Sequence, residues 1–188
     1  MNNTNRSGKD PGSTLIKISL AALFAALIAA GTFIAIPIGP IPIVLQNFFA
    51  VLSGLVLGPL LGAAAVALYL LAGVIGFPVF AGATGGVVHF AGPTGGFLAG
   101  YLFAALAAGL IIGPRIKKSL PRLVVAATAG FLVIYVPGII WLKISGNLSW
   151  IKAFIAGFVP FIAGDIIKGI AAVLIAPRLR RTTADYIL

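Results

Sequence analysis

The sequence has no cysteine, one histidine and three acidic residues among its 188 residues. Without cysteine, disulfides, thiolate chemistry and cysteine-ligated metal sites are excluded. One histidine and three acids are also too few for most catalytic constellations. No Ser–His pair, histidine cluster or carboxylate pair lies at positions that would share one depth in a membrane. We therefore expect no enzyme, no metal site and no cofactor.

Charged residues of any kind are scarce, at 9%, whereas 61% of residues are hydrophobic and the mean hydropathy is +1.17. Soluble domains hold about 25% charged and about 45–50% apolar residues. A soluble domain of this size still exposes roughly 30% of the surface of its unfolded chain, so it cannot hide this much apolar area. The composition therefore predicts an integral membrane protein of one domain.

Six apolar segments approach the roughly 20 residues that a helix needs to cross the hydrocarbon core. Between the first two, the prolines of segment 37–42 exclude helix, because proline lacks an N–H donor and restricts the residue before it. We expect an all-α bundle of six transmembrane helices at residues 15–36, 44–57, 60–80, 94–112, 123–142 and 150–176. Residues 1–14 are expected to form a flexible cytoplasmic lead, 15–176 the membrane domain and 177–188 a basic cytoplasmic tail.

The net charge of +10 comes from short basic clusters between the apolar segments, which argues against a nucleic-acid partner. Cytoplasmic segments of membrane proteins are enriched in Lys and Arg. With a cytoplasmic N-terminus, ten of the thirteen basic residues fall inside: Arg6, Lys9, Lys17, Arg115, Lys117, Lys118, Arg122, Arg178, Arg180 and Arg181. We therefore expect both termini in the cytoplasm, the chain in the cytoplasmic (inner) cell membrane, and loops 37–42 and 81–93 on the outer face.

Asp165 and Lys168 are charged residues inside the last predicted span. Their i,i+3 spacing places both side chains on one helix face. A charge at the bilayer centre costs about 2.5–3.5 kcal/mol on insertion scales, so such residues usually face a cavity or a partner. Two interpretations stay open: the pair binds a ligand, or its charges simply neutralise each other while Lys168 extends toward the inner surface.

Glycine is concentrated before the fourth predicted helix, at Gly82, Gly85 and Gly86 and in the element Gly92-Pro-Thr-Gly-Gly96. Glycine allows positive φ and a close approach of backbone N–H groups to a ligand. The helix that follows brings free N–H groups and the positive end of its dipole to the same place. Ordinary turns and helix packing are the alternative, and the spacing excludes a nucleotide-binding P-loop.

Alanine recurs every four positions on the first predicted helix, in one row of Ala21, Ala25 and Ala29 and a second row of Ala22, Ala26 and Ala30. Rows of small residues let helices approach closely in lipid. Packing within the chain and docking of a partner helix both account for them.

Four motifs span nearly the whole chain: Pro40-Ile-Pro-Ile-Val-Leu-Gln46, Gly76-Phe-Pro-Val-Phe-Ala-Gly82, Gly92-Pro-Thr-Gly-Gly-Phe-Leu-Ala-Gly100 and Gly164-Asp-Ile-Ile-Lys168. Together they resemble the BioY family of biotin transporters, the substrate-capture (S) components of energy-coupling factor (ECF) transporters. The resemblance implies a six-helix bundle that binds biotin with high affinity near its outer face. It also implies partners, a transmembrane coupling subunit and a pair of ATPases, although some family members occur without them. The alanine rows look like the surface that meets the coupling subunit.

The residues fit that ligand chemically. The ureido ring of biotin has two N–H donors and one carbonyl acceptor, so Asp165 can accept and Lys168 can donate. Its carboxylate can take donors from loop N–H groups, Thr94 or His89, and the reverse pose with Lys168 on the carboxylate stays open. Phe97 stands where the resemblance leads us to expect tyrosine, and Tyr101 lies on the same helix face. We expect a binding site of Asp165, Lys168, Gln46, Gly82, Gly85, Gly86, His89, Thr94, Phe97 and Tyr101.

Biotin capture for uptake is the leading hypothesis. Ion or proton translocation through Asp165 is a second class of function, but a relay needs further acids or histidines inside the membrane. An S component of the same architecture for another small vitamin is a third. The sequence leaves open whether the coupling ATPases are needed and whether the chain forms a homo-oligomer.

Overall fold

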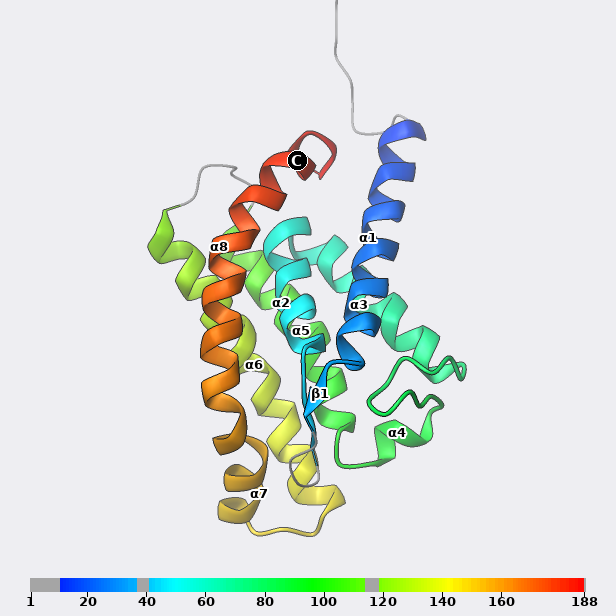
Figure 1. Cartoon of the computed structure of the whole chain (residues 1–188), viewed down its shortest axis with the longest axis vertical. Helices are drawn as coiled ribbons and strands as arrows, with labels where there is room; N and C mark the ends of the chain where they lie inside the picture. Colours follow the sequence, from blue (N-terminus) through cyan, green and yellow to red (C-terminus); the bar gives the residue numbers. More distant parts are fainter. Residues whose placement is uncertain (1–10, 37–40, 114–118, 188) are drawn as a thin grey trace, which may run out of the picture.

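The computed structural model describes residues 11–36, 41–113 and 119–187 (Figure 1). Its elements are α1 (Pro11–Thr32), β1 (Ala35–Ile36), β2 (Ile43–Val44), α2 (Gln46–Leu57), α3 (Pro59–Val74), α4 (Val88–Ala91), α5 (Gly95–Ile112), α6 (Leu120–Ser145), α7 (Trp150–Gly157), the 3₁₀ turn η1 (Val159–Phe161) and α8 (Ile162–Ile187). β1 and β2 pair antiparallel as a short hairpin. Several residues invoked above lie outside the described ranges: Arg6, Lys9, Pro37, Pro40, Arg115, Lys117 and Lys118.

The apolar segments predicted from the sequence are helical. Within the described residues, four helices are long and apolar enough to cross a membrane: α1, α5, α6 and the unit that joins α7 to α8. The apolar helices α2 and α3 are shorter. The chain is therefore an all-α membrane protein, as the composition predicts.

The prediction of one continuous helix over residues 150–176 is wrong. α7 ends at Gly157, the chain turns through η1, and α8 begins at Ile162. Pro160 lies in this turn, and a proline removes a helical hydrogen bond and crowds the preceding turn. α8 then continues through Pro177 to Ile187, past the predicted end at residue 176.

Other helix ends differ less. α1 begins at Pro11, so residues 11–14, which we assigned to the lead, are helical. α3 ends at Val74 and not at residue 80, because Gly76 has a φ of 108°, which no helix contains. The glycine-rich segment 81–93 holds the short helix α4.

α2 is the central helix of the bundle. All of its residues except Phe49 are buried, and it packs against α1, α3, α5 and α8 (Figure 1). Its backbone closely approaches α5 at Gly54, where an added Cβ would lie 2.2 Å from the carbonyl oxygen of Ala105. Any side chain larger than hydrogen at this position would clash with α5, so glycine allows the two helices to cross closely.

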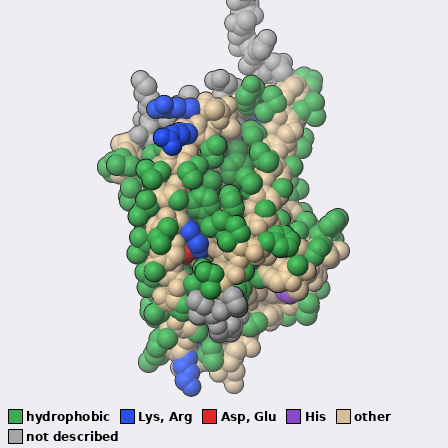
Figure 2. All heavy atoms as spheres, in the orientation of Figure 1, with side chains coloured by type: hydrophobic (Ala, Val, Ile, Leu, Met, Phe, Trp, Pro, Cys, Tyr) green, Lys and Arg blue, Asp and Glu red, His purple; other side chains and the backbone are tan. Residues whose placement is uncertain are grey.

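The outer surface suits lipid. Figure 2 shows hydrophobic side chains over most of one face, with Lys and Arg at the upper end, at the lower end and, beside an acidic side chain, near the middle. Large apolar side chains on several helices are exposed, among them Leu60, Leu132, Ile151 and Ile167. Contiguous apolar surface of this extent marks contact with a membrane or a partner.

We predict that Gly54→Ala destabilises the protein by about 1–3 kcal/mol, because the new methyl group forces α2 and α5 apart. The thermal unfolding midpoint, followed by tryptophan fluorescence in one detergent, measures the effect. Gly169→Ala on α8 is the matched control, since its Cβ would lie 3.9 Å from the nearest atoms of the Phe131 ring. Equal midpoints for the two variants would contradict the close packing of α2 on α5.

Candidate functional site

A cavity of about 480 Å³ opens between the hairpin, α2, α4, α5, α6 and α8. Its volume lies within the range of about 300–1,000 Å³ that is usual for small-molecule sites. Most of its wall is apolar or aromatic, with a few polar side chains among them. This is the composition expected of a site that encloses a largely apolar ligand and fixes its orientation by a few hydrogen bonds.

The structure brings most of the predicted site residues to this cavity. Those that line it are Gln46, Gly82, His89, Thr94, Phe97, Tyr101, Asp165 and Lys168. They come from positions up to 122 apart in the chain, since Gln46 lies on α2 and Lys168 on α8. Folding therefore assembles one polar site from four of the elements and the glycine-rich loop.

Gly85 and Gly86 do not line the cavity. The Gly86 N–H donates a 2.7 Å hydrogen bond to the carbonyl of Gly73 at the end of α3. A Cβ on Gly85 would lie 2.3 Å from the carbonyl oxygen of Phe77. These glycines fold the loop back onto α3, which is the turn-and-packing alternative that the sequence left open.

Asp165 and Lys168 form the centre of a polar network at the cavity wall. Lys168 Nζ lies 3.1 Å from Asp165 Oδ1, and the two side chains are 10% and 9% exposed, respectively. Asn47 bridges them: its Nδ2 donates to Asp165 Oδ1 at 2.9 Å and its Oδ1 accepts from Lys168 at 2.9 Å. Lys168 also donates to the Val44 carbonyl at 2.8 Å, and the Tyr135 hydroxyl donates to Asp165 Oδ2.

This network has little spare hydrogen-bonding capacity. Lys168 has three N–H donors, and all three have partners. A carboxylate has about four acceptor sites, of which Asp165 uses three for Asn47, Tyr135 and Lys168. About one acceptor site of Asp165 and the second N–H of Asn47 remain available for a ligand. The pair is thus neutralised internally and also faces the cavity.

Gln46 is held rigidly in a second network. Its Nε2 donates to Thr32 Oγ1 at 2.8 Å and to the Tyr69 hydroxyl at 2.5 Å. The Tyr101 hydroxyl donates to Gln46 Oε1 at 3.4 Å. Thr32 in turn donates to the Val79 carbonyl at 2.9 Å, which ties α1 to the segment after α3. The amide therefore presents a fixed orientation to the cavity.

Aromatic rings form much of the remaining wall. Phe97 lies edge-on to Tyr135 at 6.4 Å between ring centroids and also contacts Phe161 at 6.4 Å. Phe80 lies 5.5 Å from the His89 ring. Such rings enclose apolar ligand surface and contribute roughly 0.5–1.5 kcal/mol per aromatic pair to packing.

The sequence reasoning missed several residues of the wall. Asn47 directly follows Gln46 in the sequence, but only the fold shows that it bridges Asp165 and Lys168. Nothing in the sequence marks Tyr135 or Phe161 as residues of the wall. No spacing in the sequence links Tyr135 on α6 to Asp165 on α8. Phe161 reaches the cavity because η1 interrupts the last predicted helix.

The family model described as "BioY family" matches residues 3–185 of this chain. The chain belongs to the BioY family. The "Probable biotin transporter BioY" of Pyrococcus horikoshii is 45% identical over 168 residues, which cover 89% of this chain and 98% of that protein. The "Biotin transporter BioY" of Thermotoga maritima is 43% identical over 165 residues, covering 88% of this chain and 96% of that protein.

The fold agrees with this BioY assignment. The crystal structure of the S-component for biotin from an ECF-type ABC transporter matches with a TM-score of 0.81 and 31% identity, covering 92% of this chain and 94% of that one. BioY relatives are named as transporters and not as enzymes. The resemblance drawn from the four motifs is confirmed.

We predict that Lys168→Met alone destabilises this BioY chain by about 3–5 kcal/mol, because it leaves the buried Asp165 carboxylate without its counter-charge. The double variant Asp165→Asn/Lys168→Met removes both charges, so its loss is smaller than the sum of the two single losses. Thermal or denaturant unfolding of all four proteins in one detergent measures the coupling. Additive losses would show that the two charges do not stabilise each other.

Proposed function

We propose that this chain binds biotin with high affinity and serves as the substrate-capture component for biotin uptake in an ECF-type transporter. The observation that carries the proposal is the network of Asp165, Lys168 and Asn47, which opens onto an apolar and aromatic cavity of about 480 Å³. Its family relatives are named as biotin transporters, which favours biotin over another small vitamin.

In the proposed pose the ureido ring lies against this network. A ureido N–H donates to the remaining acceptor site of Asp165, and the free N–H of Asn47 donates to the ureido carbonyl. The three donors of Lys168 are occupied by Val44, Asn47 and Asp165. Lys168 therefore holds the carboxylate and amide in place, and this favours the ureido end here over the reverse pose.

The carboxylate of biotin then points to the wall formed by α4 and the start of α5. His89 and Thr94 line the cavity there. Thr94 is the residue before the first turn of α5, where the positive dipole end favours an anion. The Gly95 and Phe97 N–H groups of this turn already donate to the Gly92 and Thr94 carbonyls, so we assign the Gly96 N–H to the carboxylate. In Figure 1, α4 and α8 lie on opposite sides of the molecule. Because both helices line the cavity, the two polar ends of one ligand can contact them at the same time.

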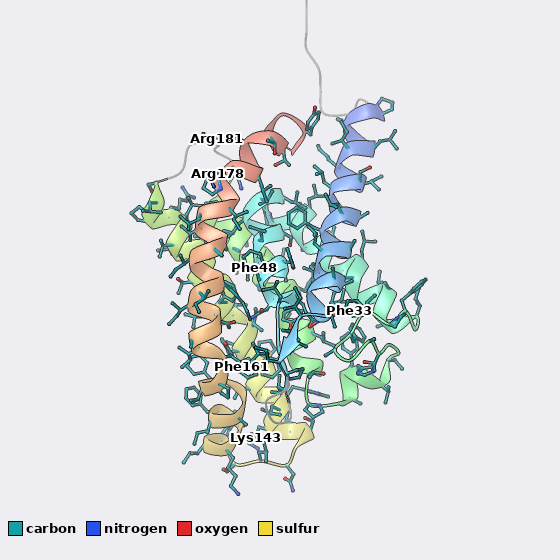
Figure 3. All side chains as sticks on the ribbon, in the orientation of Figure 1. Phe33, Phe48, Lys143, Phe161, Arg178 and Arg181 are labelled. Carbon is teal, nitrogen blue, oxygen red and sulfur yellow. The ribbon has the colours of Figure 1, made fainter. Side chains whose placement is uncertain are left out.

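For the topology, we propose that the chain crosses the inner cell membrane six times, with both termini in the cytoplasm. The N-terminal end of α1 and the C-terminal end of α8 lie at one end of the bundle (Figure 1). Figure 3 shows Arg178 and Arg181 at that end and Lys143 at the other, with the cavity residue Phe161 closer to Lys143. The positive-inside rule then places the cavity toward the outer face.

For the partners, we propose that α1 docks on the transmembrane coupling subunit, which associates with the ATPase pair. Ala22 and Ala26 are exposed, whereas Ala25 and Ala29 are half-buried and Ala21 is buried in the chain's own core. The second alanine row thus offers a smooth surface on which a helix can pack closely in lipid. The first row serves mainly the packing of α1 on α2 and α3.

We predict that Asp165→Asn weakens biotin binding about tenfold to hundredfold, the effect of losing a hydrogen bond to a charged group. Calorimetric titration of the purified protein measures it. Asp185→Asn is the matched control: it is the same substitution on the same helix, about 30 Å further along at 1.5 Å per residue. Affinity within twofold of the unsubstituted protein for Asp165→Asn would remove the proposed site.

We also predict that biotin methyl ester binds at least about tenfold more weakly than biotin, because the ester loses the charge that the wall at α5 recognises. Thr94→Val should narrow this difference. Thr84→Val is the control, since the Thr84 hydroxyl bonds the Ala81 carbonyl and does not line the cavity. Equal affinity of the unsubstituted protein for acid and ester would place the carboxylate outside the site.

A further inference from the structure

Another pocket of about 480 Å³ lies at the end of the bundle where α1 begins and α8 ends. It is formed by α1, the junction of α2 and α3, the end of α5 and the end of α8, and it shares no residue with the candidate biotin site. The side chains that define it are Lys17, Leu57, Leu60, Leu61, Leu110 and Arg180. Two of these are cations, and no acid lies among the described residues of its wall.

Arg180 is the buried cation of this pocket, at 4% exposure. Its Nη1 donates to the Leu55 carbonyl at 2.7 Å near the end of α2, and its Nη2 donates to the Gly113 carbonyl at the end of α5. Its Nε is also buried and has no partner within the described residues. A buried donor without an acceptor is costly, so the described protein groups leave the guanidinium incompletely satisfied.

The local charge is positive after these contacts are counted. The C-terminal ends of α2 and α5 together carry about −1 elementary charge, which the guanidinium of Arg180 offsets. The half-buried ammonium of Lys17 and the N-terminal end of α3, worth about +0.5, remain. The first turn of α3 also leaves the N–H groups of Leu60 and Leu61 without intrahelical acceptors. Two kinds of donor, the Lys17 ammonium and the backbone N–H groups of α3, therefore converge on one pocket beside the Arg180 guanidinium.

The rest of the wall is apolar and open to the outside. Leu60 is 81% exposed and Leu110 is 66% exposed. In a membrane, these side chains contact acyl chains just beside the cationic groups. The ligand that matches both parts is an amphiphile with an anionic head and a hydrocarbon tail.

We propose that this pocket binds the phosphate group of an anionic phospholipid from the adjacent leaflet. The phosphate accepts hydrogen bonds from Lys17 and from the first turn of α3, beside the charged guanidinium of Arg180, while the acyl chains lie over Leu60 and Leu110. A zwitterionic lipid binds less well, because its choline group brings a positive charge toward Lys17. This site is independent of the transported ligand.

Native mass spectrometry of the full chain tests the proposal, with phosphatidylglycerol and phosphatidylcholine offered in equal amounts. We expect one phosphatidylglycerol to be retained in preference. Lys17→Gln should reduce this preference about fivefold, the contribution of one basic residue at an anionic surface, and Lys17→Arg should retain it. Lys152→Gln, which removes one exposed charge after the α6–α7 turn, is the matched control and should leave the preference unchanged.

Equal retention of the two lipids, or equal preference in Lys17→Gln and Lys152→Gln, would overturn the proposal. Displacement of the lipid by an equal concentration of glycerol 3-phosphate would do the same, since it would assign the pocket to free phosphate esters. Biotin titration of the Lys17→Gln protein separates lipid binding from biotin binding. We expect the biotin affinity of this variant to equal that of the unsubstituted protein, whichever lipid is retained.

Discussion

The ammonium group of Lys168 must be neutralised in a largely buried position, and much of the site depends on how this is done. Asp165 supplies the charge, Asn47 bridges the two groups, and the Val44 carbonyl accepts the third hydrogen bond. These partners come from α8, α2 and the hairpin, so one cation connects three separate elements. The same contacts that make the charges tolerable in lipid also set the polar wall of the cavity.

The central position of α2 makes this arrangement achievable. With 12 residues, α2 is shorter than a helix that crosses the hydrocarbon core in contact with lipid, but α2 is enclosed by α1, α3, α5 and α8 and so is shielded from lipid. Gly54 permits the close crossing with α5. Gln46 and Asn47, at the start of α2, therefore lie side by side at the cavity wall, and each belongs to a different hydrogen-bond network.

Much of this could be read from the sequence, because some features depend on residues close together in the chain. Composition alone indicates lipid as the solvent, and the i,i+3 spacing alone places Asp165 and Lys168 on one face. The break at Pro160 was missed, since prolines are also tolerated inside membrane helices, as Pro137 is in α6. Tyr135 was missed because its contact with Asp165 depends on how α6 packs beside α8, which no local pattern specifies. Gly85 and Gly86 belong to the same glycine-rich segment as Gly82. Only the folded loop shows that Gly82 lines the cavity, whereas Gly85 and Gly86 form turns and pack against the protein.

The bond from Lys168 to the Val44 carbonyl has a mechanical consequence. Within the described residues, one side-chain hydrogen bond joins β2 to α8, and the adjoining Leu45 N–H is shared between the carbonyls of Gly31 and Ile34. Any cargo that recruits Lys168 must take a donor from Val44, Asn47 or Asp165. Recruitment of the donor on Val44 would remove the hydrogen bond between the hairpin and α8, so the hairpin wall of the cavity and the charge within it would respond together to an arriving molecule.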